Sequence, residues 1–276
     1  MPKKQPENKA SKIINKSGNK LLLQTAKFFE EKLWDVNVAP YYLDPITGKP
    51  REIDIIVKKK FPVSAGRNGI ERVEEVTIRL FIECKYLNEE ATTVLWLRDK
   101  NLNEAKKLVI NNSVIGNDET KIPILTDCKH HQLNENKVIK LSAYADNDPI
   151  SSAIGSTLNS LAFFRKQYTD YSYYVDFPII IIDPNGNLFA ENSSNQNGYE
   201  QVNEPLQWEV DYSFSTSPER PMSEHFLINI VPINKLDNFI TIFEKTTVAS
   251  IKKCLRERVY NSIQIQSNYK NLDYGL

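Results

Sequence analysis

The sequence has few cysteines, no surplus of either charge and no long apolar run. Its three cysteines are Cys84, Cys128 and Cys254, and its 35 basic residues equal its 35 acidic residues in number. An odd number of distant cysteines argues against a disulfide framework, and zero net charge creates no overall field toward nucleic acid or membranes. The longest apolar run, near residues 177–182, is far shorter than the ~20 residues that cross a bilayer. No apolar segment follows the initial Met-Pro-Lys-Lys, so we expect a cytoplasmic protein without a membrane partner.

The composition predicts one large domain with a basic tail. Hydrophobic residues make up 41% of the 276 residues, which is enough to bury a sizeable core. Residues 1–17 are lysine-rich and almost free of apolar side chains, which predicts a flexible, solvated tail, or alternatively an arm that contacts phosphate. We expect a core over residues 18–185, with 88–148 as an elaboration of it. Residues 186–276 are expected to add strands and an amphipathic helix packed on the core, or alternatively a partner-binding or dimerisation surface.

Hydrophobic periodicity predicts an α/β fold with a central mixed β-sheet flanked by helices. Helical spacing favours helices over residues 19–35, 150–164 and 236–258. Strands are predicted over residues 36–43, 51–58, 76–85, 93–97, 178–182, 188–190, 208–214 and 226–231. A turn is predicted at residues 44–48, and loops around Pro62, Gly66 and Gly69 and over residues 111–136, with a short helix at 102–110. The all-apolar run 178–182 is typical of a strand buried on both faces.

Three ionisable residues are embedded in the predicted sheet. Residues 76–85 alternate at the period of a strand, so Glu83 and Lys85 project from the same face. Asp54 lies among β-branched residues in the strand before it. If the two strands pair as a hairpin, Asp54 approaches the other two side chains. Burial of three such groups is costly unless they satisfy one another or a metal ion does so. The alternative interpretation is a strand-edge acid and a surface ion pair.

Two segments carry a resemblance to a known family. Glu52-Ile53-Asp54 and Phe81-Ile82-Glu83-Cys84-Lys85, set between an N-terminal helix and a later helix and strand, resemble the PD-(D/E)XK nuclease superfamily, the restriction-endonuclease-like fold, and within it the Mrr-like restriction and repair branches. The match covers residues 18–86 by motif and 150–183 by element order. It implies a restriction-endonuclease-like core with a C-terminal β/α elaboration.

The resemblance also implies a reaction and a metal. Phosphodiester hydrolysis needs a nucleophilic water and compensation for developing negative charge, and a carboxylate-held Mg²⁺ supplies both. Asp54, Glu83 and Lys85 are the implied catalytic residues. Asp54, Glu83 and the backbone carbonyl of Cys84 are the implied metal ligands, with Mn²⁺ expected to substitute for Mg²⁺. Lys85 would orient or activate the attacking water.

Further residues are candidates for accessory roles. Many relatives carry another acid on the first helix, where this chain has Gln24. Gln24 could bind a metal-bound water, and Glu31 could substitute, although an i,i+4 pair with Lys27 explains Glu31 equally well. Ser156 or Asn159, on the helix after the Glu-X-Lys strand, could face the site or lie on the helix surface. Candidate phosphate contacts, or a solvated face, are Lys58, Lys59, Lys60, Lys252, Lys253 and Arg256.

These features predict a metal-dependent nuclease that hydrolyses DNA, acting in restriction, other defence or repair. The alternative is a non-catalytic nucleic-acid-binding or scaffolding subunit that retains the fold. DNA is the expected partner in the first case, and a homodimer or a partner subunit is compatible with both. The two alternatives differ in whether the Asp54 and Glu83 carboxylates converge within reach of one ion.

Overall fold

A computed structural model of the chain describes residues 19–67, 70–87, 92–99, 137–144, 149–165, 173–192, 198–213, 223–253 and 255–256. The predicted tail and the segment 100–136 lie outside these residues. The described helices and strands, in chain order, are α2 (Asn19–Glu31), β1 (Asp35–Val38), β2 (Tyr41–Leu43), β3 (Pro50–Glu52), β4 (Ile55–Arg67), β5 (Ile70–Tyr86), β6 (Thr93–Asp99), β7 (Lys137–Tyr144), α4 (Pro149–Arg165), β8 (Tyr173–Asp183), β9 (Leu188–Asn192), β10 (Gly198–Gln201), β11 (Leu206–Ser213), β12 (Ser223–Pro232), η3 (Ile233–Lys235), α5 (Leu236–Ile242) and η4 (Phe243–Val248).

Most of these strands form one mixed sheet. Within the described ranges it has ten strands in the order β1-β4-β5-β8-β12-β11-β7-β6-β9-β10. Strands β5, β8 and β12 run parallel, whereas β1, β4 and β5 form an antiparallel meander. A single residue pair, Trp208 with Ile139, joins the first six strands to the last four. Strands β2 and β3 form a separate hairpin. The predicted α/β class with a central mixed sheet is confirmed.

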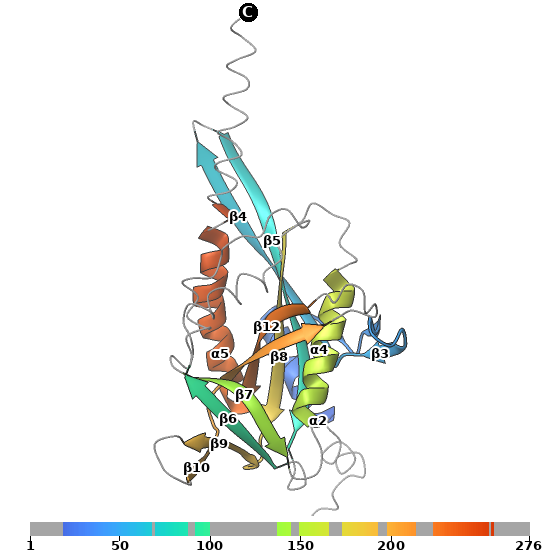
Figure 1. The fold of residues 1–276 in the computed structure, drawn as a ribbon. Coiled ribbons are helices and arrows are strands. Elements are labelled where there is room, and N and C mark those ends of the chain that lie inside the picture. The colour runs from blue at the N-terminus through green and yellow to red at the C-terminus, as the bar shows by residue number, and fades with distance from the viewer. Residues whose placement is uncertain are drawn as a thin grey trace, which may run out of the picture.

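Helices cover both faces of the sheet (Figure 1). Helices α2 and α5 share one apolar core with alternate residues of β5, from Val76 to Cys84. Helix α4 shares the second core with Phe81 and with the hairpin residue Tyr42. Glu83 and Lys85 alternate with the first set and therefore belong to the α4 face. This face carries the candidate site.

Strand β8 is the central strand that its apolar run predicts. Ile179 and Ile181 are buried in the core with α2 and α5, while Ile180 and Ile182 are buried in the core with α4. Strand β8 pairs with β5 on one side and with β12 on the other. A strand covered on both faces has no polar side to present, which explains four consecutive isoleucines. Because β12 belongs to the segment after residue 186, that segment extends the same sheet.

The predicted strand boundaries around Asp54 were wrong. The strand expected over residues 36–43 is two strands, β1 and β2, in different sheets. Ala39 adopts a left-handed φ of 54° at the break, directly before Pro40. The strand expected over 51–58 is likewise divided into β3 and β4, and Asp54 lies between them. Both breaks occur together because Ala39 N–H donates to the Asp54 carbonyl, at 2.8 Å, and Ile53 N–H donates to the Pro40 carbonyl, at 3.3 Å.

The loop expected around Pro62 is instead part of a long ribbon. Strand β4 continues to Arg67 and β5 begins at Ile70, and the ribbon that they form extends beyond the rest of the sheet (Figure 1). Beyond Lys58, β4 has no partner on its β1 side in the described structure. Proline is tolerated on such an edge because its missing N–H removes no ladder bond there.

The C-terminal helix and two further strands also differ from expectation. The helix predicted over 236–258 starts at Leu236 as expected, but residues Phe243–Val248 form a π-helical segment. Strands β7 and β10 were not predicted at all. None of the described helices is long and apolar enough to cross a membrane.

Candidate active site

Asp54 is held at the start of β4 by the main chain of β5. Its carboxylate Oδ2 accepts a hydrogen bond of 2.7 Å from the backbone N–H of Cys84. The register pairs Ile55 with Ile82, so Cys84 lies just past the beginning of β4, where no strand carbonyl takes its N–H. The Asp54 side chain therefore substitutes for a ladder partner. This hydrogen bond fixes the carboxylate beside the Glu-X-Lys segment.

Glu83 and Lys85 lie side by side on β5, as the alternation predicts. Lys85 Nζ is 2.9 Å from Glu83 Oε2, and the Glu83 residue is only 3% exposed. Strand β5 has neighbours on both sides, with Glu83 opposite Ile180 of β8. The interpretation of this pair as an exposed surface ion pair is therefore wrong, since the sheet and α4 bury its acidic member.

The pKa values of Asp54, Glu83 and Lys85 are all raised. Burial raises the pKa of Glu83 to about 7, and the negative charge of Asp54 adds to this, against the opposing effect of Lys85. Burial also raises the pKa of Asp54, although the Cys84 N–H and Lys85 oppose it. Burial lowers the pKa of Lys85, but the charge and hydrogen bond of Glu83, and then the charge of Asp54, outweigh burial and raise it overall. Two partly desolvated carboxylates are thus poorly compensated by one ammonium.

The donor set suits a hard divalent cation. Mg²⁺ prefers oxygen ligands and is commonly held by one or two carboxylates, with water completing its shell. Asp54 and Glu83 supply the carboxylates. The N–H and C=O of a strand residue point to the same neighbour in an antiparallel ladder, so the Cys84 carbonyl is directed to the same side as its N–H, toward Asp54. Within the described residues, no group of three or more His, Cys, Asp or Glu side chains surrounds a common point.

The structure places the predicted helix residues of α2 away from this face. Gln24 is exposed, and Glu31 forms the exposed i,i+4 pair with Lys27, at 3.8 Å, that was its alternative explanation. Thr25 faces the sheet instead, with its hydroxyl 3.7 Å from the sulfur of Cys84 on the opposite face from Glu83. Helix α2 therefore supports the strand that carries the site.

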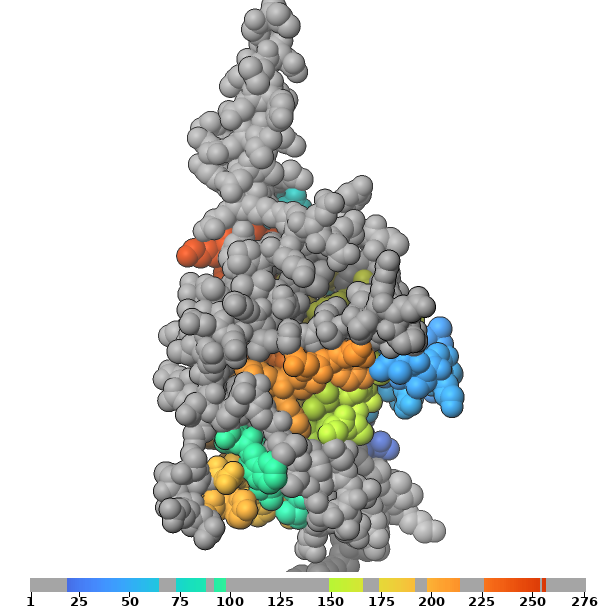
Figure 2. All heavy atoms as spheres, viewed as in Figure 1, coloured from blue at the N-terminus to red at the C-terminus, as the bar shows by residue number. Residues whose placement is uncertain are grey.

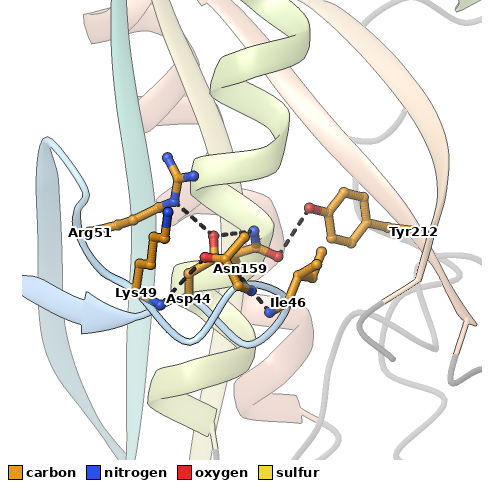
Figure 3. A network of polar contacts seen from close by, with 7 residues as sticks. Asp44, Ile46, Lys49, Arg51, Asn159 and Tyr212 are labelled. Atoms are coloured by element: carbon orange, nitrogen blue, oxygen red, sulfur yellow. Dashed lines mark hydrogen bonds and ion pairs between the residues drawn. The ribbon is translucent and has the colours of Figure 1, made fainter. Parts of the chain in front are cut away.

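Helix α4 contributes a polar network that sequence reasoning missed (Figure 3). Asn159 is buried, and its amide nitrogen donates to Asp44 Oδ2 at 3.1 Å while its amide oxygen accepts from the Tyr212 hydroxyl at 3.0 Å. Arg51 Nε lies 3.0 Å from the same Asp44 oxygen. The other Asp44 oxygen accepts from the backbone N–H groups of Ile46 and Thr47. Asn159 is thus a buried network residue, not a helix-surface residue.

This network joins three parts of the chain next to the site. Asp44 and Arg51 come from the β2–β3 hairpin, Asn159 from α4 and Tyr212 from β11. Burial raises the pKa of Asp44, but its backbone and side-chain donors and Arg51 outweigh burial, so the pKa is lowered overall. The hairpin stands at the surface beside α4 (Figure 2) and leads directly into Asp54. The sequence predicted the turn that begins at Asp44. No local pattern indicated that Asn159, 115 residues away, is a partner of Asp44.

Tyr42 brings a further polar group to the same region. The residue is 2% exposed, and its hydroxyl has no hydrogen-bond partner within the described part of the chain. Burial, followed by the negative charges of Asp44 and Glu83, raises the pKa of Tyr42 to about 12, and the Ser156 hydroxyl partly opposes this. Ser156, a predicted accessory residue, is therefore near Tyr42.

The predicted phosphate contacts do not form one patch. Lys58 pairs with Asp35 at 3.0 Å and Lys60 with Glu75 at 3.2 Å, both with exposed side chains. They alternate with Lys59, which points to the other face and bonds Glu244 at 2.9 Å. Residues Lys252, Lys253 and Arg256 lie after η4, and Arg256 donates to the backbone carbonyl of Ser64. Of these predicted phosphate contacts in the β4 segment, Lys58 and Lys60 thus lie on the face of Glu83.

Comparison with models of protein families, with curated proteins and with solved structures found no match to this chain.

Proposed function

We propose that this chain is a metal-dependent nuclease that hydrolyses DNA phosphodiester bonds. The observation that carries the proposal is the placement of two desolvated acids, Asp54 bonded to the backbone N–H of Cys84 and Glu83 next to it on β5, with Lys85 paired to Glu83. Such a cluster in a buried sheet is costly to maintain without a ligand. The described order of α2, β1, β4, β5, α4 and β8 supports the resemblance to PD-(D/E)XK nucleases, because it places both motif segments between the helix and the helix–strand pair that the resemblance requires.

The roles of the residues follow from their positions. Asp54, Glu83 and the Cys84 carbonyl would hold Mg²⁺, or Mn²⁺ in its place. When bound, the ion would compensate charge on the phosphate and lower the pKa of a coordinated water. Lys85 has a raised pKa and is therefore an ammonium at neutral pH. It can orient the attacking water and stabilise negative charge on the phosphoryl oxygens, but in this state it cannot accept a proton.

The proposed substrate and biological role rest on the resemblance and on the basic residues at the surface of β4. Lys58 and Lys60 lie on the site face of β4 and provide charges for a DNA backbone. A role in restriction, other defence or repair, in the cytoplasm, is proposed from the resemblance to the Mrr-like branches.

A non-catalytic subunit that binds nucleic acid is the second candidate. It is favoured by the exposed Gln24 where many relatives carry an acid, and by the absence of a third acid beside Asp54 and Glu83 in the described structure. Such a protein would bind DNA without cutting it.

The test is cleavage of circular and linear DNA by the purified protein with Mg²⁺, with Mn²⁺ and with EDTA. We expect metal-dependent cutting that Asp54→Ala and Lys85→Ala abolish. Asp237→Asn and Lys27→Ala are matched controls, because each removes an exposed member of a surface ion pair on α5 or α2, the helices that cover the opposite face of the sheet. DNA binding without cutting under every condition would favour the non-catalytic subunit. Cutting that survives Asp54→Ala would rule out the proposed site.

A further inference from the structure

The β2–β3 hairpin presents two cations, Lys49 and Arg51, on one face. Lys49 lies opposite Asp44, whose backbone N–H donates to the Lys49 carbonyl at 2.9 Å, and Arg51 lies opposite Tyr42. The two cations stand two positions apart, so their side chains project to the same side of the hairpin. Figure 3 shows them extending in the same direction. Glu52, the acid of β3, alternates to the other side.

The guanidinium of Arg51 is held by the buried Asp44 through one edge. Its Nε lies 3.0 Å from Asp44 Oδ2, and the Asp44 carboxylate is itself fixed by hydrogen bonds from Ile46, Thr47 and Asn159. In Figure 3 the two terminal nitrogens of Arg51 point away from Asp44. The Arg51 side chain is 52% exposed. Its terminal N–H groups therefore remain available to a ligand at the surface.

The ammonium of Lys49 is also available. The contacts that Lys49 makes with described residues are made by its backbone, which donates to the Thr47 hydroxyl at 3.4 Å and accepts from Asp44. Its side chain is exposed and forms no ion pair within the described part of the chain. Charge compensation of the buried Asp44 requires one cation, and Arg51 supplies it. Lys49 is thus a second, independent positive charge beside Arg51.

A phosphate group is the anion that suits this pair. A guanidinium presents a planar fork of N–H donors that matches phosphate oxygens, and an ammonium binds phosphate as a point charge. An anion held between two cations also relieves their mutual repulsion. Because Asp44 already orients Arg51, little side-chain entropy remains to be lost when the anion binds. The hairpin therefore carries a preorganised anion site.

The hairpin is fixed to the start of β4, where the proposed metal ligand Asp54 lies. Ile53 N–H donates to the Pro40 carbonyl at 3.3 Å, and Ala39 N–H donates to the Asp54 carbonyl at 2.8 Å. Arg51 precedes Asp54 by three positions, so their Cα atoms are at most about 11 Å apart. One DNA strand carries a phosphate about every 3.4 Å of helix axis. A strand cut beside Asp54 therefore places another phosphate within reach of the hairpin.

We propose that Lys49 and Arg51 form a phosphate-binding site for the DNA strand that is cut. The ammonium and the terminal guanidinium nitrogens hold a backbone phosphate near the scissile one, and Asp44 positions Arg51 for this contact. This inference rests on the proposed function and says how the site binds its substrate. Backbone contacts carry no sequence information, so the contribution is the same for every DNA sequence. They act equally in the ground state and the transition state, and therefore lower KM without changing kcat.

The test has two measurements on the full chain. DNA affinity is measured in EDTA at several salt concentrations, and cleavage is measured with Mg²⁺ as a function of DNA concentration. The variants are Lys49→Gln, Arg51→Gln and the double variant. Lys27→Gln is the matched control, because it removes one exposed positive charge from α2, on the opposite face of the sheet. The Tm of each variant is recorded, because Arg51→Gln also removes the ion pair of Asp44.

We expect each single variant to reduce the slope of log affinity against log salt by about 1, and the double variant by about 2. KM should rise while kcat is unchanged, and Lys49→Gln should keep the wild-type Tm. Lys27→Gln should keep the wild-type slope.

Two outcomes would overturn the inference. One is a double variant with the wild-type slope and KM, and if Asp54→Ala still abolishes cutting, the nuclease function stands without this phosphate site. The other is a lower Tm of Arg51→Gln while both single variants keep the wild-type slope, which would assign Arg51 to the stability of the hairpin alone. Reduced slopes in a protein that cuts DNA under no condition would support the phosphate site and overturn the proposed catalysis.

Discussion

The Asp54 carboxylate and the Cys84 backbone N–H form a 2.7 Å hydrogen bond across the start of the β4–β5 ladder. The bond joins a side chain outside any strand to a central strand, immediately beside Glu83. Main-chain geometry, which side-chain substitutions elsewhere hardly alter, thus sets the position of one of the two acids. A site built on such a rigid element keeps its geometry before a ligand binds.

Substitution of Asp54 should separate its structural and chemical roles. Asp54→Ala leaves the Cys84 N–H without an acceptor, which should destabilise the protein by about 1–2 kcal/mol relative to Asp54→Asn, because the asparagine oxygen can still accept. Both variants should lose metal binding. Urea unfolding and Mn²⁺ titration measure the two effects. Equal stability of the two variants would show that the N–H finds another acceptor.

Glu83 should make the stability of the protein fall as pH rises. Its folded pKa is about 7 against an ordinary 4.5, so between these values the folded protein holds a proton that the unfolded chain has released. The free energy of unfolding should decrease across this window, by up to about 3 kcal/mol for such a shift. Asp54, whose pKa is also raised, contributes with the same sign.

Glu83→Gln should remove this dependence and be more stable than wild type at pH 8, while the proposed nuclease activity should be lost. Urea unfolding in metal-free buffer between pH 5 and 8 measures the difference. Glu75→Gln, a substitution on the same strand in an exposed pair, should retain the wild-type profile. If the free energy of unfolding of Glu83→Gln depends on pH as that of wild type does, Glu83 is not the group responsible for the pH dependence.

Asn159 should be the most sensitive member of the hairpin network. Asn159→Ala deprives both Asp44 and Tyr212 of a partner at a buried position, which should cost about 2–4 kcal/mol, since each unsatisfied group costs ~1–3 kcal/mol. Tyr212→Phe removes only one of the two bonds and should cost less, as its hydroxyl is half-buried. Thermal and urea unfolding measure both. If the two variants are equally stable, the Asp44–Asn159 bond contributes nothing.

Substitutions of the β4 lysines should have different effects on the two faces of the sheet. Lys59 bonds Glu244 and the Lys32 carbonyl and stacks over Trp34 at 5.6 Å, so Lys59→Ala should destabilise the protein by about 1–2 kcal/mol. Its DNA affinity should keep the wild-type salt dependence. Lys60→Ala should leave stability unchanged and reduce the slope of log affinity against log salt by about 1 if Lys60 contacts phosphate. DNA binding in EDTA at several salt concentrations distinguishes them.

The sequence by itself determined the features that repeat locally. Alternation along residues 76–85 placed Glu83 and Lys85 on one face, and the isoleucine run identified β8 as a central strand, because side-chain direction in a strand follows from a two-residue period. Local patterns did not reveal that the strands expected over residues 36–43 and 51–58 are each interrupted and form two strands. The division depends on hydrogen bonds between Ala39 and Asp54 and between Pro40 and Ile53. Strand propensity continues through both breaks and so carries no sign of them.

Only the tertiary structure decided what surrounds the site. From the sequence, Asn159 either faces the site or lies on the helix surface; its burial against Asp44, 115 residues earlier, appears only in the folded structure. Tyr42 reads as an ordinary strand tyrosine until the hairpin folds onto α4 and buries it. The sequence suggests one basic patch of Lys58, Lys59 and Lys60. In the structure, side chains alternate along β4 and Lys59 bonds Glu244 on the other face. In each case the deciding contact joins segments distant in sequence, and its energy is set by burial, which exists only once the layers are assembled.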